Sequence, residues 1–151
     1  MSPAKNLPLS LLYEHDETAW LETMAQLAAE GRCAEMDQAH LSEYLSDMAR
    51  RDRREVMSRL VTLLTHLLKW EHQPNHRSGS WRATIVEQRR ELREVLESGT
   101  LYNHALAVLA KAHADAIKQV AAETSLPRAT FPAACPWDLD AILADDETAE
   151  A

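Results

Sequence analysis

The 151-residue chain contains few of the residues that interrupt helices, with only three glycines and six prolines. Runs of β-branched residues, which are typical of strands, are also scarce, whereas Ala, Leu, Glu and Arg are frequent. This composition argues against a sheet-rich fold. The longest apolar stretch, residues 60–68, is short and is interrupted by Thr62, Thr65 and His66. We therefore expect no membrane span.

Cysteine is almost absent as well. Cys33 and Cys135 stand in unrelated contexts and form no disulfide framework. The N-terminus offers one lysine and a brief LPLSLL patch, which is too little for a secretory signal. We expect reduced thiols in a cytoplasmic protein.

The spacing of apolar residues predicts an all-α fold, an up-and-down helical bundle of about five helices in a single domain over residues 12–144. The predicted helices cover residues 14–30, 37–49, 52–72, 81–98 and 101–124. Residues 1–11 are expected to be a flexible N-terminus, and residues 145–151 a disordered acidic C-terminus. Asp52 and Glu55 have capping-box spacing, but no Gly or Pro lies between Met48 and Val56. The second and third helices are either separated by a kink or continuous.

The helix over residues 52–72 is apolar on two sides, and Leu64 belongs to both of its apolar rows. Such a helix must pack on two sides, so we expect it at the centre of the bundle with Leu64 fully buried. Pro74 ends it, since proline lacks an amide hydrogen. Ser80 is a suitable N-cap for the next helix, opening at Trp81. The pair predicts an antiparallel helical hairpin.

Four sequence segments resemble the domain of unknown function 29 family. They are LYEHDETAW (12–20), MDQAHL (36–41), HLLKWEHQPNHRSGSWRATIVEQRREL (66–92) and TSLPRATFPAACPW (124–137). Where family members have a Gly-Arg-Ser-like break before the central helix, this chain has Ala49, Arg50 and Arg51. The resemblance implies an all-α protein of a bacterial cytoplasm, and it supplies no activity.

Charge is distributed unevenly along the chain. The net charge is −8, yet residues 50–93 alone carry 11 basic and 5 acidic side chains. A basic central hairpin between acidic flanks suggests a non-catalytic protein-interaction module. Its partner would be an acidic protein or, through self-association, the acidic flanks of another copy. Nucleic acid is not favoured, because Glu87, Glu91 and Glu94 are interleaved with the arginines at ion-pair spacing.

The turn inside this hairpin is a candidate anion-binding site, formed by Lys69, Arg77, Ser78, Ser80 and Arg82. A helix N-terminus offers unpaired amide hydrogens and partial positive charge, which suit a phosphate, a sulfate or a partner's carboxylate. In the alternative interpretation Ser80 caps the helix and Arg77 binds the last carbonyls of the preceding helix.

The alternative function is an enzyme that uses a small anion or a metal, with a site around His66, His113, Arg77 and Arg82. His66 and His113 are weak candidates for metal ligands, with Glu43 as a third, although a hydrogen-bonded core histidine is the commoner explanation. No catalytic residues, metal site or cofactor motif can be assigned from the sequence. A cleft joining the four residues would favour the enzyme, whereas a closed apolar interior with external arginines would favour the interaction module.

Overall fold

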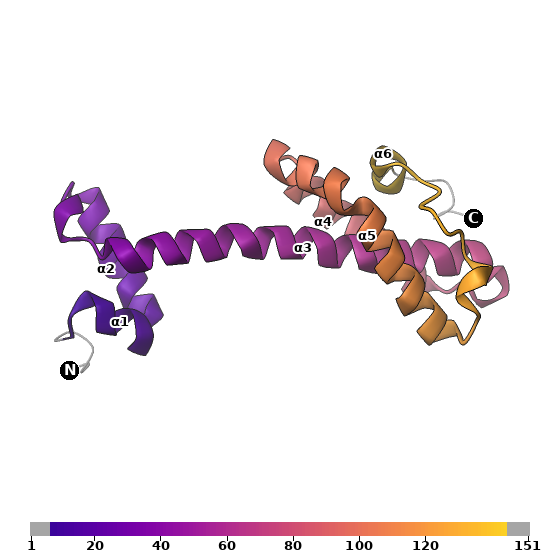
Figure 1. The fold of residues 1–151 in the computed structure, drawn as a ribbon, viewed down its shortest axis with the longest axis horizontal. Coiled ribbons are helices and arrows are strands. Elements are labelled where there is room, and N and C mark those ends of the chain that lie inside the picture. The colour runs from indigo at the N-terminus through magenta and orange to yellow at the C-terminus, as the bar shows by residue number, and fades with distance from the viewer. Residues whose placement is uncertain (1–6, 145–151) are drawn as a thin grey trace. The chain divides into compact units, whose positions relative to one another are not determined.

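The computed structural model describes residues 7–144, and all regular structure in that range is helical (Figure 1). The elements are α1 (Leu9–His15), α2 (Glu17–Ala29), η2 (Cys33–Glu35), α3 (Gln38–His72), η3 (Pro74–His76), α4 (Gly79–Val95), α5 (Gly99–Thr124), η4 (Arg128–Thr130) and α6 (Leu139–Leu143). The predicted all-α class is confirmed. Within residues 7–144, no helix is long and apolar enough to cross a bilayer. The acidic segment 145–151 and the first six residues lie outside the described range.

Contacts group the chain into two compact units, residues 1–50 and 51–151, and each is described by itself. The first unit contains α1, α2, η2 and the beginning of α3. Its core is formed by Leu12, Trp20 and Met24. The assignment of residues 12–144 to one domain stays a prediction.

Residues 9–11, which were expected in a flexible N-terminus, form the first turn of α1. The helix predicted over residues 14–30 is accordingly two helices that meet at Asp16. Asp16 has a non-helical backbone, and its carboxylate accepts a hydrogen bond from the Ala19 amide at 3.1 Å. Asp16 is thus the N-cap of α2. Gly31, with a φ of 71°, follows the end of α2.

The helices predicted at 37–49 and 52–72 form one continuous helix, α3. Arg, Glu and Met are good helix formers, and no Gly or Pro interrupts them between Met48 and Val56. The capping-box spacing of Asp52 and Glu55 therefore does not break the helix. Leu64 is fully buried, as predicted.

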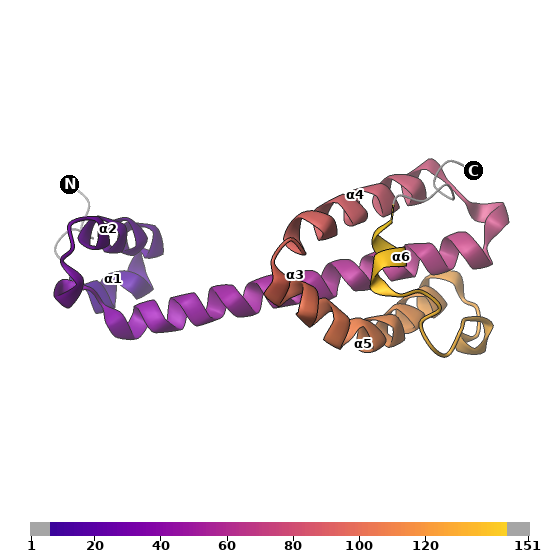
Figure 2. The same cartoon turned by 90° about the horizontal axis from the view of Figure 1, so that it is seen from above.

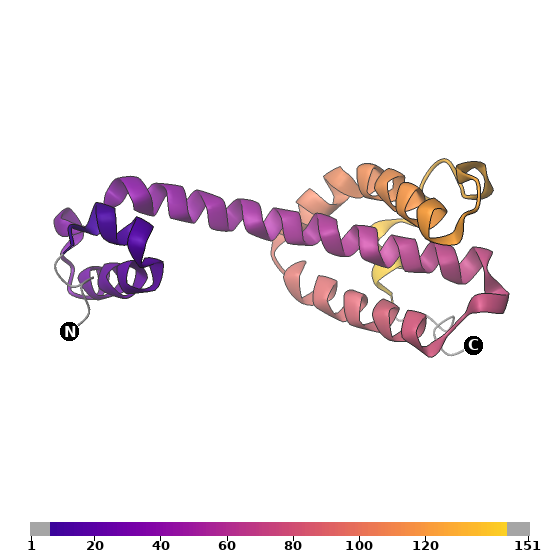
Figure 3. The ribbon, with the colours of Figure 1, turned by 90° about the horizontal axis from the view of Figure 1, so that it is seen from below.

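In the second unit, α4 and α5 flank the residues of α3 that belong to it (Figures 2 and 3). Helix α4 runs antiparallel to α3, and α5 returns in the direction of α3. The predicted hairpin of α3 and α4 is present. Helix α6, capped by Asp138, packs on α4 and α5. The buried guanidinium of Arg89 on α4 donates to the Ile142 carbonyl of α6 at 2.9 Å.

Helix α5 buries small residues where its sequence pattern favours a large one. The spacing of large apolar residues places Leu106 on the inner face of this helix, but Leu106 is 49% exposed. Small residues occupy that face instead: Ala105, Ala112 and Ala116 are fully buried. A buried alanine face lets the neighbouring helices approach more closely than a row of leucines would.

Candidate functional site

The candidate site is the segment between α3 and α4, residues 69–82, which we call the α3–α4 turn. Helix α3 ends at His72 because Pro74 follows and restricts Gln73 to a non-helical backbone conformation. A short 3-10 helix then leads to Ser78, where the chain is extended before α4 begins. Both ends of the turn are thus held by helices of the same unit.

Two arginines of the turn lie against one tryptophan ring. The Cζ atoms of Arg77 and Arg82 are 4.8 and 5.7 Å from the centroid of the Trp70 ring. Arg77 is fixed further, since its Nε donates a hydrogen bond to the Trp70 carbonyl at 2.8 Å. Trp70 is only 4% exposed, whereas both arginines are exposed. Cation–π attraction thus holds two positive charges at the surface of a buried ring.

Within residues 7–144, neither of these guanidinium groups is paired with a carboxylate. The only hydrogen bond of Arg77 there goes to a neutral carbonyl, and the contact of Arg82 is with the ring. Two positive charges against the same ring repel each other. A negatively charged group bound beside Arg77 and Arg82 would offset this repulsion and is therefore favoured.

The residue that caps α4 is Ser78, whereas the sequence pattern predicted Ser80. Ser78 is the N-cap of α4, and its hydroxyl accepts a hydrogen bond from the Trp81 amide at 3.2 Å. Helix α4 therefore begins at Gly79, two residues before the predicted start at Trp81, and Ser80 lies in its first turn. Capping by Ser78 leaves the first two amides of the helix, at Gly79 and Ser80, without a backbone partner in the described range.

Lys69 contacts other groups than the two arginines do. Its ammonium group forms an ion pair with Glu123 of α5 and lies 5.4 Å from the centroid of the Trp81 ring. The side chain is only 11% exposed. Lys69 therefore links α3 to α5, and of the five predicted anion ligands it is the one already matched by a carboxylate.

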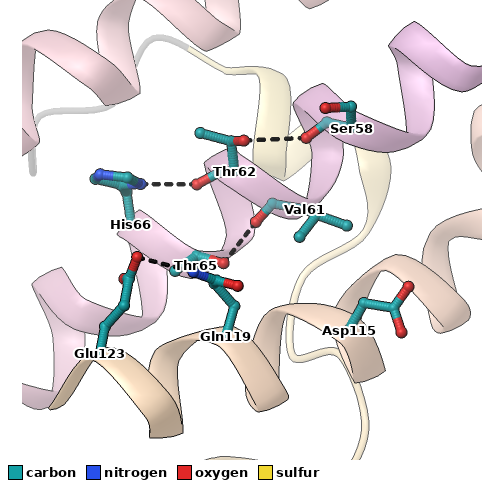
Figure 4. Close-up of a pocket in the computed structure, with 8 residues that line it drawn as sticks. All are labelled: Ser58, Val61, Thr62, Thr65, His66, Asp115, Gln119 and Glu123. Carbon is teal, nitrogen blue, oxygen red and sulfur yellow. Dashed lines mark hydrogen bonds between the residues drawn. The ribbon is translucent and has the colours of Figure 1, made fainter.

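The histidines suggested as metal ligands are not brought together with the arginines. His113 is 2% exposed, and burial lowers its pKa below the ordinary value. Its Nε2 atom has no hydrogen-bond partner in the described part of the chain. His66 lines a cavity between α3 and α5, but His113, Arg77 and Arg82 do not (Figure 4). Across residues 7–144, no three His, Cys, Asp or Glu side chains gather as a metal site would require, so Glu43 does not complete one.

A polar cluster in the first unit was missed by the sequence reasoning. The Asp37 carboxylate accepts hydrogen bonds from His40 Nδ1 at 2.7 Å and from the indole Nε1 of Trp20 at 3.2 Å. The His40 ring stacks on Tyr13 with a centroid distance of 4.3 Å. Burial alone would raise the pKa of Asp37, but its hydrogen bonds outweigh burial and leave the pKa below its ordinary value. The cluster fixes α3 to α1 and α2, which is a structural role.

The fold and the turn define a helical protein that exposes two arginines on a buried indole, and neither arginine is paired with a carboxylate within residues 7–144. A family model described as "Domain of unknown function DUF29" matches residues 12–147, and the chain belongs to this family. No curated protein and no solved structure matches the chain.

Proposed function

We propose that this protein is a non-catalytic interaction module whose α3–α4 turn binds a carboxylate-rich segment of an acidic partner protein. One observation carries the proposal: Arg77 and Arg82 are held against Trp70 and are matched by no carboxylate in the described part of the chain. An arginine prepositioned by a ring loses less side-chain freedom on binding than a free arginine does.

The ligand class follows from the donors at the turn. Arg77 keeps its terminal guanidinium nitrogens, because only its Nε is bonded. The amides of Gly79 and Ser80 point from the N-terminal end of a 17-residue helix, where the helix dipole adds partial positive charge. Hydrogen-bond donors that have no acceptor in the described part of the chain suit a carboxylate as ligand. Two separate guanidinium groups suit a peptide segment that carries more than one acidic side chain.

The enzyme alternative receives less support. It required a cleft that joins His66, His113, Arg77 and Arg82, but His113 is buried in the core and the two arginines lie at the surface. The cavity beside His66 contains none of the other three residues. The cytoplasm is the compartment we propose, since both cysteines are free and Cys33 is exposed.

A titration with hexaglutamate peptide, followed by ¹⁵N-resolved NMR, tests the proposal. We expect salt-sensitive shifts of the Gly79 and Ser80 amides and of the Trp70 indole, and none with hexaserine. The double variant Arg77→Gln/Arg82→Gln should lose these shifts, whereas Arg128→Gln, an exposed arginine on η4, should keep them. Equal shifts in both variants, or shifts elsewhere in the chain, would contradict the proposal.

The same variants distinguish another copy of the chain from a foreign partner. If the acidic flanks of a second copy occupy the turn, sedimentation velocity should detect a dimer that dissociates with salt and with Arg77→Gln/Arg82→Gln. A wild-type monomer that binds hexaglutamate would point to a foreign acidic partner.

A further inference from the structure

A cavity of about 370 Å³ lies between α3 and α5, and no residue of the α3–α4 turn lines it (Figure 4). Its volume falls in the range of small-molecule sites, about 300–1,000 Å³. Helix α3 lines it with Ser58, Val61, Thr62, Thr65 and His66, and α5 lines it with Asp115, Gln119 and Glu123. Positions 58, 62 and 66 are four residues apart, as are positions 115, 119 and 123. Each row therefore extends about 12 Å along its helix, and the cavity is an elongated groove.

The threonines of α3 offer only acceptors to this groove. The Thr62 hydroxyl donates its proton to the Ser58 carbonyl at 3.1 Å, and the Thr65 hydroxyl donates to the Val61 carbonyl at 2.7 Å. A hydroxyl has a single proton, so both oxygens keep only lone pairs for a ligand.

His66 adds a further acceptor. Its Nδ1 atom is 2.8 Å from the Thr62 carbonyl oxygen. A carbonyl can only accept, so Nδ1 carries a ring proton in this contact, and Nε2 is the ring nitrogen that can act as an acceptor.

Two carboxylates of α5 face the groove, and in the described part of the chain only one of them is paired. Glu123 forms an ion pair with Lys69 and accepts a hydrogen bond from Gln119 at 3.0 Å. Burial alone would raise the pKa of Glu123, but these partners outweigh it and lower the pKa. Asp115 is half-buried and forms no hydrogen bond or ion pair within residues 7–144. The groove thus retains one unmatched negative charge among acceptors.

We propose that this groove binds an alkylammonium group, with its charge beside Asp115 and its carbon chain along Thr62 and Thr65. An ammonium group has three N–H donors and no acceptor, which matches the oxygens of Thr62 and Thr65 and a carboxylate, that of Asp115, with no partner in the described part of the chain. An anion would meet Asp115, and a neutral ligand would leave that charge unpaired. The ligand is either a free diamine or the side chain of a lysine, and the site is independent of the function proposed for the α3–α4 turn.

Calorimetry and NMR with butane-1,4-diamine test this inference, and butane-1,4-diol serves as an uncharged control of the same length. The titration is run at about 0.15 M salt, where the Debye length is about 8 Å, so that general attraction to an acidic protein is screened. The diamine, and not the diol, should shift amides of residues 58–66 and 115–123. Tighter binding of Nα-acetyl-lysine N-methylamide than of the diamine would identify a lysine side chain as the ligand, and the reverse order a free diamine.

Asp115→Asn removes the charge while keeping the shape of the side chain, and we expect it to weaken diamine binding at least about fivefold. Glu87→Gln removes an exposed carboxylate on α4 and should have no effect. Thr62→Val, which removes one acceptor without changing size, is a second variant in case Asp115→Asn alters folding, and it should weaken binding about twofold or more. Equal binding of diamine and diol, or wild-type affinity in folded Asp115→Asn and Thr62→Val, would overturn the proposal.

Discussion

Leu64 provides the most direct test of the core of the second unit. Its side chain is fully buried in a cluster that α3, α4 and α5 form together. Leu60, Leu63 and Leu68 surround it on the same helix and are also fully buried. Replacing Leu64 by Ala removes three carbon atoms at a place where packed helices on both sides prevent collapse. Both the lost transfer free energy and the new cavity reduce stability.

The expected loss is about 2–5 kcal/mol, the range for buried leucines replaced by alanine. A domain of this size has a free energy of unfolding of about 5–15 kcal/mol, so the variant should lose roughly a third of it. Leu106→Ala is the matched control on α5. Because Leu106 is 49% exposed, its replacement should change the free energy of unfolding by about 0.5 kcal/mol or less.

Urea unfolding followed by tryptophan fluorescence measures both variants. Trp20 is the tryptophan of the first unit, so a Trp20→Phe background leaves only signals of the second unit. A loss below about 1 kcal/mol for Leu64→Ala would show that this part of α3 is not a central, closely packed helix. A loss equal to that of Leu106→Ala would refute the packing in the same way.

Two further predictions concern pH. The pKa of Asp37 is lowered in the folded protein, so the stability that it contributes is present above its unfolded pKa and is lost as the pH falls through the folded value. Asp37→Asn should therefore flatten the acid side of a pH–stability profile relative to wild type. Burial also lowers the pKa of His113 below its ordinary value of 6.5. The stability contributed by the neutral, buried ring is therefore fully present above pH 6.5 and is lost as the pH falls through the folded pKa. Between pH values of about 7.5 and 5, wild type should lose more stability in urea than His113→Leu does; equal losses would refute this assignment.

The elements of the fold that follow from local pattern were predictable from the sequence. The two apolar rows around Leu64 required burial on two sides, and Pro74 marked the end of α3. Leu106 was predicted wrongly because periodicity gives most weight to large apolar residues. The actual inner face of α5 is built from alanines, whose role depends on how closely another helix approaches.

The candidate sites could be predicted only in part. Basic residues on either side of Pro74 indicated a charged turn, but Ser78 and Ser80 are equally good caps, and the sequence does not distinguish them. Pairing of Lys69 with Glu123 depends on how α5 packs beside α3. The groove at Asp115 also depends on how α5 packs beside α3, since the residues of its two walls are at least 49 positions apart in sequence and neither wall is distinctive alone.

The affinity of the α3–α4 turn for an acidic peptide tests the central claim most directly. Calorimetry with hexaglutamate should give about threefold to tenfold weaker binding for Arg82→Gln than for wild type, since a charge-assisted contact contributes on the order of 1 kcal/mol. Arg128→Gln should bind as wild type does, because Arg128 lies on η4. Equal weakening by the two variants would show that hexaglutamate responds to overall charge. Wild-type affinity in Arg82→Gln would contradict a role for the turn in binding.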